Sequence, residues 1–258
     1  MTKTTFGHSK EDTTLLYKQF IRSKMTDVHT AWHPHMANAH LDAAQRVQNA
    51  ALQVITGCTK KTPVQHLHDE TKVLMFRDHL DMRGTHFYDS THAPDHPLHY
   101  MRSQQPVDRN MRKTPAKYYS ALHESLPPCP EGTSMRTHIH TVITRRALAN
   151  YEPNRLLGTR PPPISEEEKT LPRADRVQLA RLRCGYSTLL PSYLERIGVA
   201  ESNQCLICQG AVGDTIHILL HCPSLQQHRS LHNIQSLEDL WTKPVEVVSF
   251  LRDAGVLQ

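Results

Sequence analysis

The feature that most restricts the fold of this chain is a group of three cysteines and one histidine near its C-terminal end. Cys205 and Cys208 are separated by two residues, His217 follows after eight more, and Cys222 after another four. Two cysteines at this spacing can bind one ion from a tight turn, and three thiolates with one imidazole complete a tetrahedral zinc site. The sequence therefore predicts one structural zinc ion per chain, bound by these four residues.

Two alternatives are open for this segment. His221 directly precedes Cys222 and shares a helical face with His217, so a site that uses His221 in place of Cys222 is conceivable, although thiolate is the stronger zinc ligand. The other alternative is that Cys205 and Cys208 are ordinary buried thiols. In either zinc site all four positions are filled by protein, so a catalytic zinc with an activated water is disfavoured.

The composition favours a mainly α-helical protein. The chain has only 10 glycines but 17 prolines among its 258 residues, which suits short helices joined by stiff connections better than a sheet-rich enzyme. Its formal net charge of +5 permits an acidic partner such as nucleic acid without requiring one. The polar start and the lack of a long apolar run predict no membrane association and an intracellular protein, in the nucleus or the cytoplasm.

Apolar periodicity predicts several helices. The clearest spans 40–56 and ends at Gly57, where a C-terminal cap belongs; another spans 10–30. Thr62 is expected to cap a third helix that begins at Pro63.

Three further elements are expected nearer the C-terminus. Ser165 and Glu168 suggest a capping box. An arginine-bearing helix follows Pro172, and the final helix covers 244–257.

The chain is expected to have three parts. Residues 1–90 form a helical segment, 91–160 a basic, proline-rich linker that is partly extended, and 161–258 a small helical region that contains the zinc module. Two basic stretches, one in the linker and one on the arginine-bearing helix, are candidate nucleic-acid contacts: Arg102, Arg109, Arg112, Lys113, Arg173 and Arg176. The alternative for these arginines is pairing with carboxylates or covering the core with their aliphatic stems.

No pattern for catalysis is found. A polymerase holds its metal ions with neighbouring Asp carboxylates, and no Asp-Asp pair occurs in this sequence. Phosphate-binding Gly loops and hydrolase motifs are also missing. We therefore expect no catalytic residue in this chain.

Several blocks of the sequence resemble the region that follows the catalytic palm in non-LTR retrotransposon reverse transcriptases of the jockey type. The blocks are Leu15-Leu16-Tyr17-Lys18, Trp32-His33-Pro34, the run from Val47 to Gly57, the run from His66 to Thr71, Leu171-Pro172-Arg173, the run from Leu179 to Tyr186 and the run from Asp239 to Pro244. The terminal cysteine–histidine pattern is similar to the one that these polymerases carry near their C-terminus. The resemblance departs from the family at Gln53, where Arg is common, and at Leu206, where Pro is frequent.

The resemblance implies a function. Residues 10–90 would be the helical thumb and its extension, and residues 205–222 the zinc knuckle associated with the element's RNA transcript or target DNA. The chain would be a non-catalytic fragment of an RNA-directed DNA polymerase from a mobile element, with a polymerase palm supplied in trans as a further partner. The alternative is a zinc-stapled helical protein-interaction module without a nucleic-acid role.

Overall fold

The computed structural model describes residues 7–100 and 114–257 and is mainly α-helical, as the composition predicted. Helix accounts for 60% of it, and the described residues contain no strand, only an isolated antiparallel bridge between Gln204 and Val212. None of the described helices is both long and apolar enough to cross a membrane.

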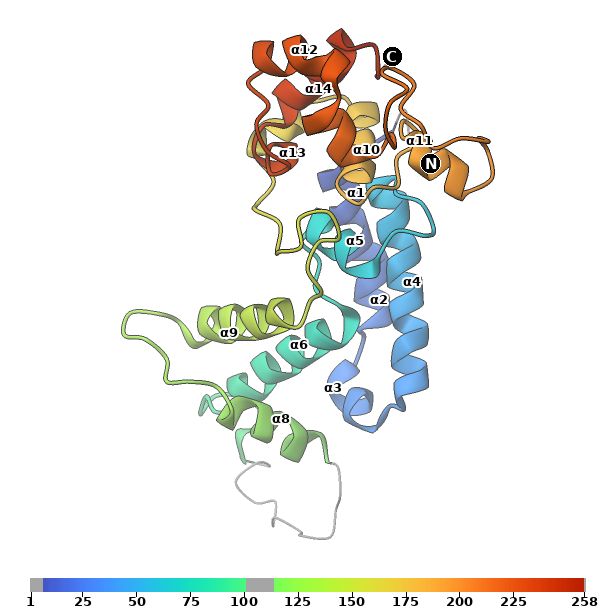
Figure 1. The fold of residues 1–258 in the computed structure, drawn as a ribbon. Coiled ribbons are helices and arrows are strands. Elements are labelled where there is room, and N and C mark those ends of the chain that lie inside the picture. The colour runs from blue at the N-terminus through green and yellow to red at the C-terminus, as the bar shows by residue number, and fades with distance from the viewer. Residues whose placement is uncertain (1–6, 101–113, 258) are drawn as a thin grey trace. The chain divides into compact units, whose positions relative to one another are not determined.

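The chain divides into two compact units, each built from separate stretches of sequence (Figure 1). Unit 1 comprises residues 1–15, 50–72 and 152–258, and unit 2 comprises 16–49 and 73–151. The longest helix, α4 (Asn38–Thr56), supplies residues 38–49 to unit 2 and its last turns to unit 1.

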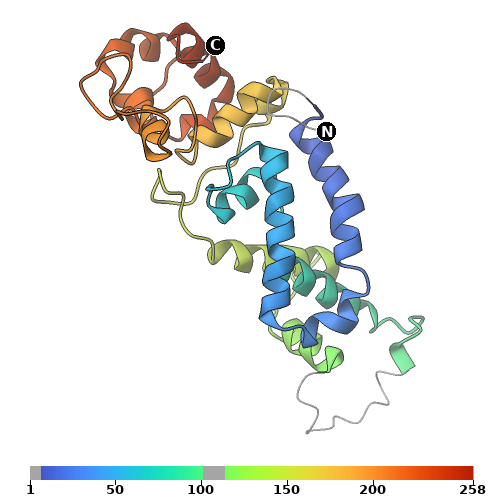
Figure 2. The same ribbon diagram turned by 90° about the vertical axis from the view of Figure 1, so that its right-hand side faces the viewer.

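Unit 2 packs helices around α6. Its elements are η1 (Tyr17–Arg22), α2 (Ser23–Met25), α3 (His29–Trp32), η2 (His33–His35), the first part of α4, α6 (Phe76–Ser90), α8 (Pro115–Glu124) and α9 (Met135–Ala149). The segment from Tyr17 to Met25 runs alongside α4 (Figure 2), where the Tyr17 hydroxyl donates to Oε1 of Gln48 over 2.7 Å. The amide of Gln48 donates in turn to the Leu74 carbonyl, so this buried side chain is fully engaged.

The segment 91–160, expected to be a partly extended linker, contains two helices of unit 2. Thr114 caps α8 by accepting from the N–H of Lys117, and Ser134 caps α9 in the same way through the N–H of Thr137. Both helices pack on α6 through buried residues such as Tyr119 and Ile139. The expectation was wrong because tertiary packing and caps stabilise helices whose apolar residues show little regular spacing.

Unit 1 has its core in the C-terminal half of the chain. Its elements are α1 (Lys10–Leu16), the end of α4, α5 (Val64–Thr71), η3 (Glu166–Thr170), α10 (Arg173–Leu182), α11 (Pro191–Arg196), η4 (His217–His221), η5 (Pro223–Leu225), α12 (Gln226–Leu231), α13 (Asp239–Thr242) and α14 (Pro244–Asp253). Apolar side chains of α10, η4, α13 and α14 form one cluster that also contains Cys205 and Cys222. The metal-binding segment is therefore part of the main core of this unit.

Some helix ends in unit 1 lie at the residues that the sequence predicted, and others lie at different residues. Gly57 follows α4 with φ of +68°, and a Cβ there would lie 2.6 Å from Cγ2 of Val177, so both the backbone and the packing require glycine. Helix α5 begins at Val64 with Pro63 at the N-cap, so Thr62 is not the cap. Ser165 does cap η3, but Glu168 does not complete a capping box, since its carboxylate is buried against Arg183.

Candidate metal centre

A tight turn positions the first two cysteines. The N–H of Cys205 donates to the Ala211 carbonyl over 2.7 Å, and the N–H of Gln209 donates to the Cys205 carbonyl over 2.9 Å. Gln209 takes a left-handed conformation with φ of +53°. These bonds fold the Cys205–Cys208 pair back on itself, so both sulfurs face the same point.

The second pair of ligands is positioned by a glycine and a short helix. A Cβ at Gly213 would lie 2.9 Å from Cδ of Pro191 and 3.0 Å from Cα of Cys205, so only glycine lets the chain pass here. Helix η4 begins four residues later, and its His217 N–H donates to Oδ1 of Asp214 over 2.7 Å. The N–H of Cys222 donates to the His217 carbonyl, which keeps the last cysteine beside the histidine.

The four side chains converge on one point. One ligand atom from each of Cys205, Cys208, His217 and Cys222 lies within 4.8 Å of all the others. The Sγ atoms of Cys205 and Cys222 are 4.0 Å apart, and Sγ of Cys208 is 3.2 Å from Nε2 of His217. A tetrahedral ion with metal–sulfur bonds of about 2.3 Å places two sulfurs about 3.8 Å apart, so the observed spacing fits one such ion. The cluster could therefore hold a metal ion.

The structure favours Cys222 over His221 as the fourth ligand. Cys222 is 0% exposed and points into the cluster, whereas His221 is exposed and takes no part in it. The sequence alone could not decide between His221 and Cys222, because the choice depends on where η4 ends.

The thiols of the cluster lie in different electrostatic surroundings. A backbone hydrogen bond from Gly210 is the largest influence on Cys208, and with the adjacent thiols it lowers the pKa of that cysteine. Burial raises the pKa of Cys222 to about 11, and the Cys208 thiol adds to the effect. A cation at the centre would favour the thiolate form of both residues.

The arrangement is suited to a structural role. Three sulfurs and one imidazole fill the four positions of a tetrahedral ion and leave none for water or substrate. Since Cys205 and Cys222 also belong to the main core of unit 1, a bound ion would join the turn, η4 and that core.

Of the six predicted nucleic-acid contacts, four lie outside the described residues and two lie on α10. Arg102, Arg109, Arg112 and Lys113 lie outside the described residues. Arg173 begins α10 and donates to the backbone carbonyls of His8, Val54 and Ile55.

Arg176 is 7% exposed and lies 2.5 Å from the Glu11 carboxylate, with Glu168 at 3.7 Å. Its charge is thus used inside unit 1, and a role as a phosphate contact does not fit this position.

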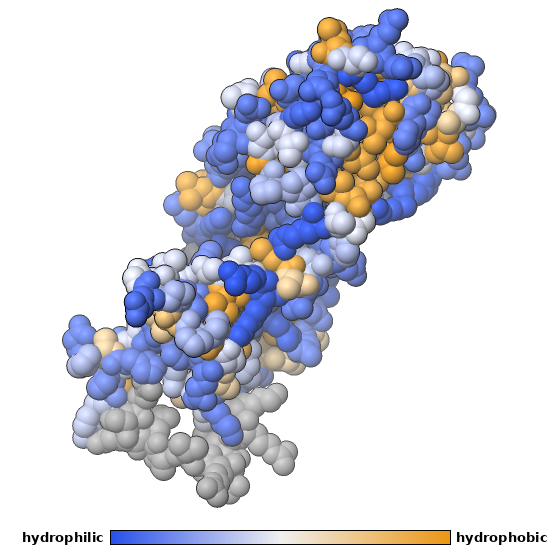
Figure 3. All heavy atoms as spheres, turned by 60° about the vertical axis from the view of Figure 1, so that its left-hand side comes forward, coloured by the Kyte–Doolittle hydropathy of each residue, from blue (hydrophilic) through white to orange (hydrophobic). Residues whose placement is uncertain are grey.

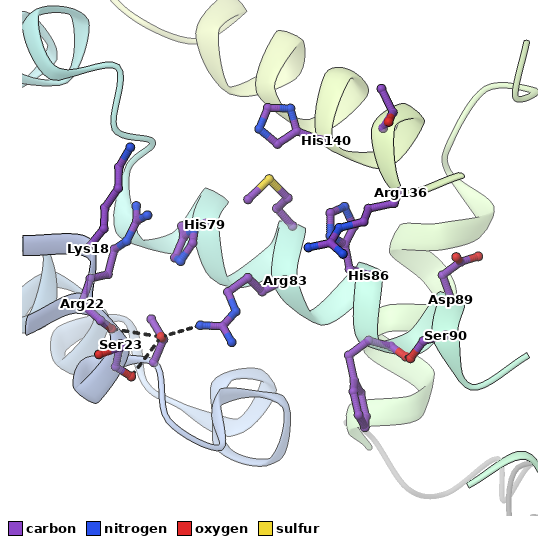
Figure 4. Close-up of a pocket in the computed structure, with 14 residues that line it drawn as sticks. Lys18, Arg22, Ser23, His79, Arg83, His86, Asp89, Ser90, Arg136 and His140 are labelled. Carbon is purple, nitrogen blue, oxygen red and sulfur yellow. Dashed lines mark hydrogen bonds between the residues drawn. The ribbon is translucent and has the colours of Figure 1, made fainter. Parts of the chain in front are cut away.

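Sequence reasoning missed two features. One is the buried Arg183 of unit 1, which forms ion pairs with Glu70 and Glu168. The other is a basic cavity in unit 2, lined by residues from η1, α2, α6 and α9 (Figure 4). Neither shows in local spacing, because each joins residues that lie far apart in the sequence.

Comparisons with known protein families, with curated proteins and with solved structures found no match.

Proposed function

We propose that the ion of the Cys205–Cys222 cluster is zinc, bound once per chain. Three thiolates and an imidazole are soft ligands that suit zinc, whereas magnesium and calcium prefer oxygen. Replacement of zinc by cobalt(II) offers a direct test, because tetrahedral thiolate ligation gives cobalt an intense visible absorption. Octahedral, weakly absorbing cobalt would contradict the assignment.

The fold and the cluster define a class: a mainly helical protein with a Cys₃His cluster in its C-terminal part that could hold a metal ion. Within that class, we propose that this chain is the non-catalytic C-terminal fragment of a jockey-type retrotransposon reverse transcriptase, and that it binds RNA or DNA. The observation that carries the proposal is the closed Cys₃His cluster at the place where the sequence resembles the knuckle of those polymerases. The positive net charge of +5 agrees with a polyanionic partner.

The binding is expected to be electrostatic and tolerant of sequence. Phosphate contacts release counterions, so the affinity for RNA or DNA should fall steeply as the salt concentration rises. The test is a salt titration of the zinc-loaded chain with single-stranded RNA, single-stranded DNA and duplex DNA of unrelated sequences. Affinity for one or more of them, with a strong salt dependence and little effect of sequence, supports the proposal. No binding to any of them at low salt would contradict it.

A second function is favoured by exposed apolar side chains on the metal-binding segment. Leu206 is 78% exposed between the two cysteines, and Val212 is 47% exposed close behind them. Apolar residues also gather over unit 1 on the face seen in Figure 3. Such side chains suit a protein partner, and binding to that partner would depend far less on salt than binding to nucleic acid.

A further inference from the structure

Unit 2 contains a cavity of about 880 Å³ whose wall is strongly basic (Figure 4). Residues from η1 and α2 form one side, α6 forms the floor, and the start of α9 forms the other side. The lining residues are Lys18, Arg22, Ser23, Thr26, His79, Met82, Arg83, His86, Phe87, Asp89, Ser90, Arg136, Thr137 and His140.

The cations of this wall have no acidic partners. Among the residues that the structure describes, no carboxylate forms an ion pair with Lys18, Arg22, Arg83 or Arg136. This contrasts with unit 1, where Arg176 and Arg183 are both paired with glutamates. The lining that the structure describes therefore carries an excess of positive charge.

The hydroxyls of Ser23, Thr26 and Ser90 already donate to backbone carbonyls, so the donors available in this wall belong mainly to its cations. Arg83 donates from Nη1 to Oγ1 of Thr26 over 2.8 Å, which steadies its guanidinium at the edge of the cavity. Asp89 is the one carboxylate of the lining, and its Oδ1 lies 3.1 Å from Nε2 of His123.

The imidazoles of His79, His86 and His140 complete the wall, and few negative charges lie near them. Nε2 of His86 is buried and has no hydrogen-bond partner among the described residues. Burial, followed by the charges of Arg22 and Arg83, lowers the pKa of His79 to about 3. Burial and the neighbouring Arg22 also lower the pKa of Lys18. An anion in the cavity would favour the charged form of each of these groups.

We propose that this cavity binds the phosphate groups of a ligand, with Arg22, Arg83 and Arg136 as the principal contacts. Guanidinium groups present paired N–H donors that match phosphate oxygens, and three such groups line this cavity. The volume exceeds what one phosphate ion needs and falls within the range of small-ligand sites. The cavity therefore suits consecutive phosphates, from a nucleic-acid strand or a free polyphosphate.

This inference rests on the proposed function where the phosphates come from nucleic acid, and it locates the contact. It predicts that the nucleic-acid affinity depends on cations of unit 2, a part of the chain that does not contain the metal centre. If a free polyphosphate is the ligand, the inference does not depend on the proposed function.

The test compares two triple variants of the zinc-loaded full chain with equal loss of charge. The first is Arg22→Gln, Arg83→Gln and Arg136→Gln. The control is Arg46→Gln, Lys117→Gln and Arg145→Gln, which removes exposed cations of unit 2 outside the cavity. Binding of single-stranded RNA, single-stranded DNA, duplex DNA and inorganic pyrophosphate is measured for each variant, and circular dichroism checks the fold. Arg136→Gln alone serves as a second variant, because this exposed side chain can be removed without disturbing the core.

Each outcome separates the two proposals. The cavity variant should lose at least tenfold in RNA affinity, lower the salt slope by about 2, and abolish competition by pyrophosphate, while the control changes little. Unchanged RNA binding by a folded cavity variant, or by Arg136→Gln, would overturn the cavity assignment and leave the proposed function standing. Cavity-dependent binding of pyrophosphate without binding of RNA or DNA would support the cavity and overturn the proposed function. No binding of pyrophosphate or of any nucleic acid would overturn both.

Discussion

Nη1 of Arg183 lies 3.0 Å from Oε1 of Glu70, and both side chains are almost completely buried in unit 1. Nη2 of the same guanidinium lies 2.5 Å from Glu168 and also donates to the Leu240 carbonyl. Lys10 supplies a second cation to both glutamates, at 3.2 and 2.8 Å. Two carboxylates and two cations thus form a buried network that joins α1, α5, η3 and the end of α10, with Arg176 and His66 at its edge.

Removal of Arg183 should strongly destabilise unit 1. Arg183→Met removes the one guanidinium that contacts both buried carboxylates and leaves Lys10 beside both, Arg176 near Glu168 and His66 near Glu70. Removal of one partner of a buried ion pair costs about 3–5 kcal/mol of folding free energy. Urea unfolding can be followed by the fluorescence of Trp241, whose ring centroid lies 5.7 Å from the Arg183 guanidinium, in a Trp32→Phe background. Lys169→Met, at an exposed cation on η3, is the control and should change the stability little, because solvent screens an exposed ion pair. Equal effects of the two substitutions would show that the network does not stabilise the fold.

Acid should weaken unit 1 through Glu70. Burial alone would raise the pKa of this carboxyl, but the charges of Arg183, Lys10 and His66 outweigh burial and lower it to about 2. Since the pKa is lower in the folded chain than in the unfolded chain, Glu70 stabilises the fold above pH ~4.5 and loses that contribution as the pH falls toward about 2. A urea series from pH 6 to pH 2.5 checks this, and the decline should be much shallower in Glu70→Gln. A parallel decline in both proteins would contradict the assignment.

Unit 2 should respond to pH in a different window. The pKa of His79 is lowered to about 3, so the unfolded chain takes up a proton at higher pH than the folded chain does. The contribution of neutral His79 is complete above pH ~6.5 and is lost as the pH falls from there toward 3. An NMR titration of the imidazole measures this directly. A titration midpoint near 6.5 in the folded protein would refute the described surroundings of His79.

Gly84→Ala should destabilise unit 2 although alanine is the better helix former. A Cβ at this position would lie 1.9 Å from Cε1 of Tyr119, so α6 and α8 must move apart. Overpacking of this kind costs about 1–3 kcal/mol and outweighs the gain of ~1 kcal/mol in helix propensity. The measurement is thermal unfolding of Gly84→Ala beside the double variant Gly84→Ala, Tyr119→Leu, where the smaller side chain should recover part of the loss. Stabilisation by Gly84→Ala would contradict the close packing of α6 on α8.

The sequence predicted features that depend on neighbouring residues and missed those that depend on distant ones. The spacing of apolar residues predicted α4, and the adjacent Gly57 predicted its end, because both are local properties of the backbone. The convergence of Cys205, Cys208, His217 and Cys222 followed from spacing for the same reason. Local pattern makes Arg176 a candidate nucleic-acid contact and leaves pairing with a carboxylate as the alternative, whereas its partner Glu11 lies 165 residues away. Glu70, the partner of the buried Arg183, lies 113 residues away from it. Burial of a charged side chain depends on such distant partners, and local pattern does not contain them.

The central claim, a single structural zinc at Cys205, Cys208, His217 and Cys222, is tested most directly by metal content. Zinc is measured on the purified chain, on Cys208→Ser, and on the matched control His221→Asn, which changes an exposed side chain outside the cluster. We expect one zinc per chain in the wild type and in His221→Asn, and loss of zinc affinity in Cys208→Ser. Because structural zinc contributes roughly 10–16 kcal/mol of apparent binding free energy, chelation should also unfold the region around residues 204–229. A wild-type chain without zinc, or a Cys208→Ser variant that keeps full affinity, would contradict the account.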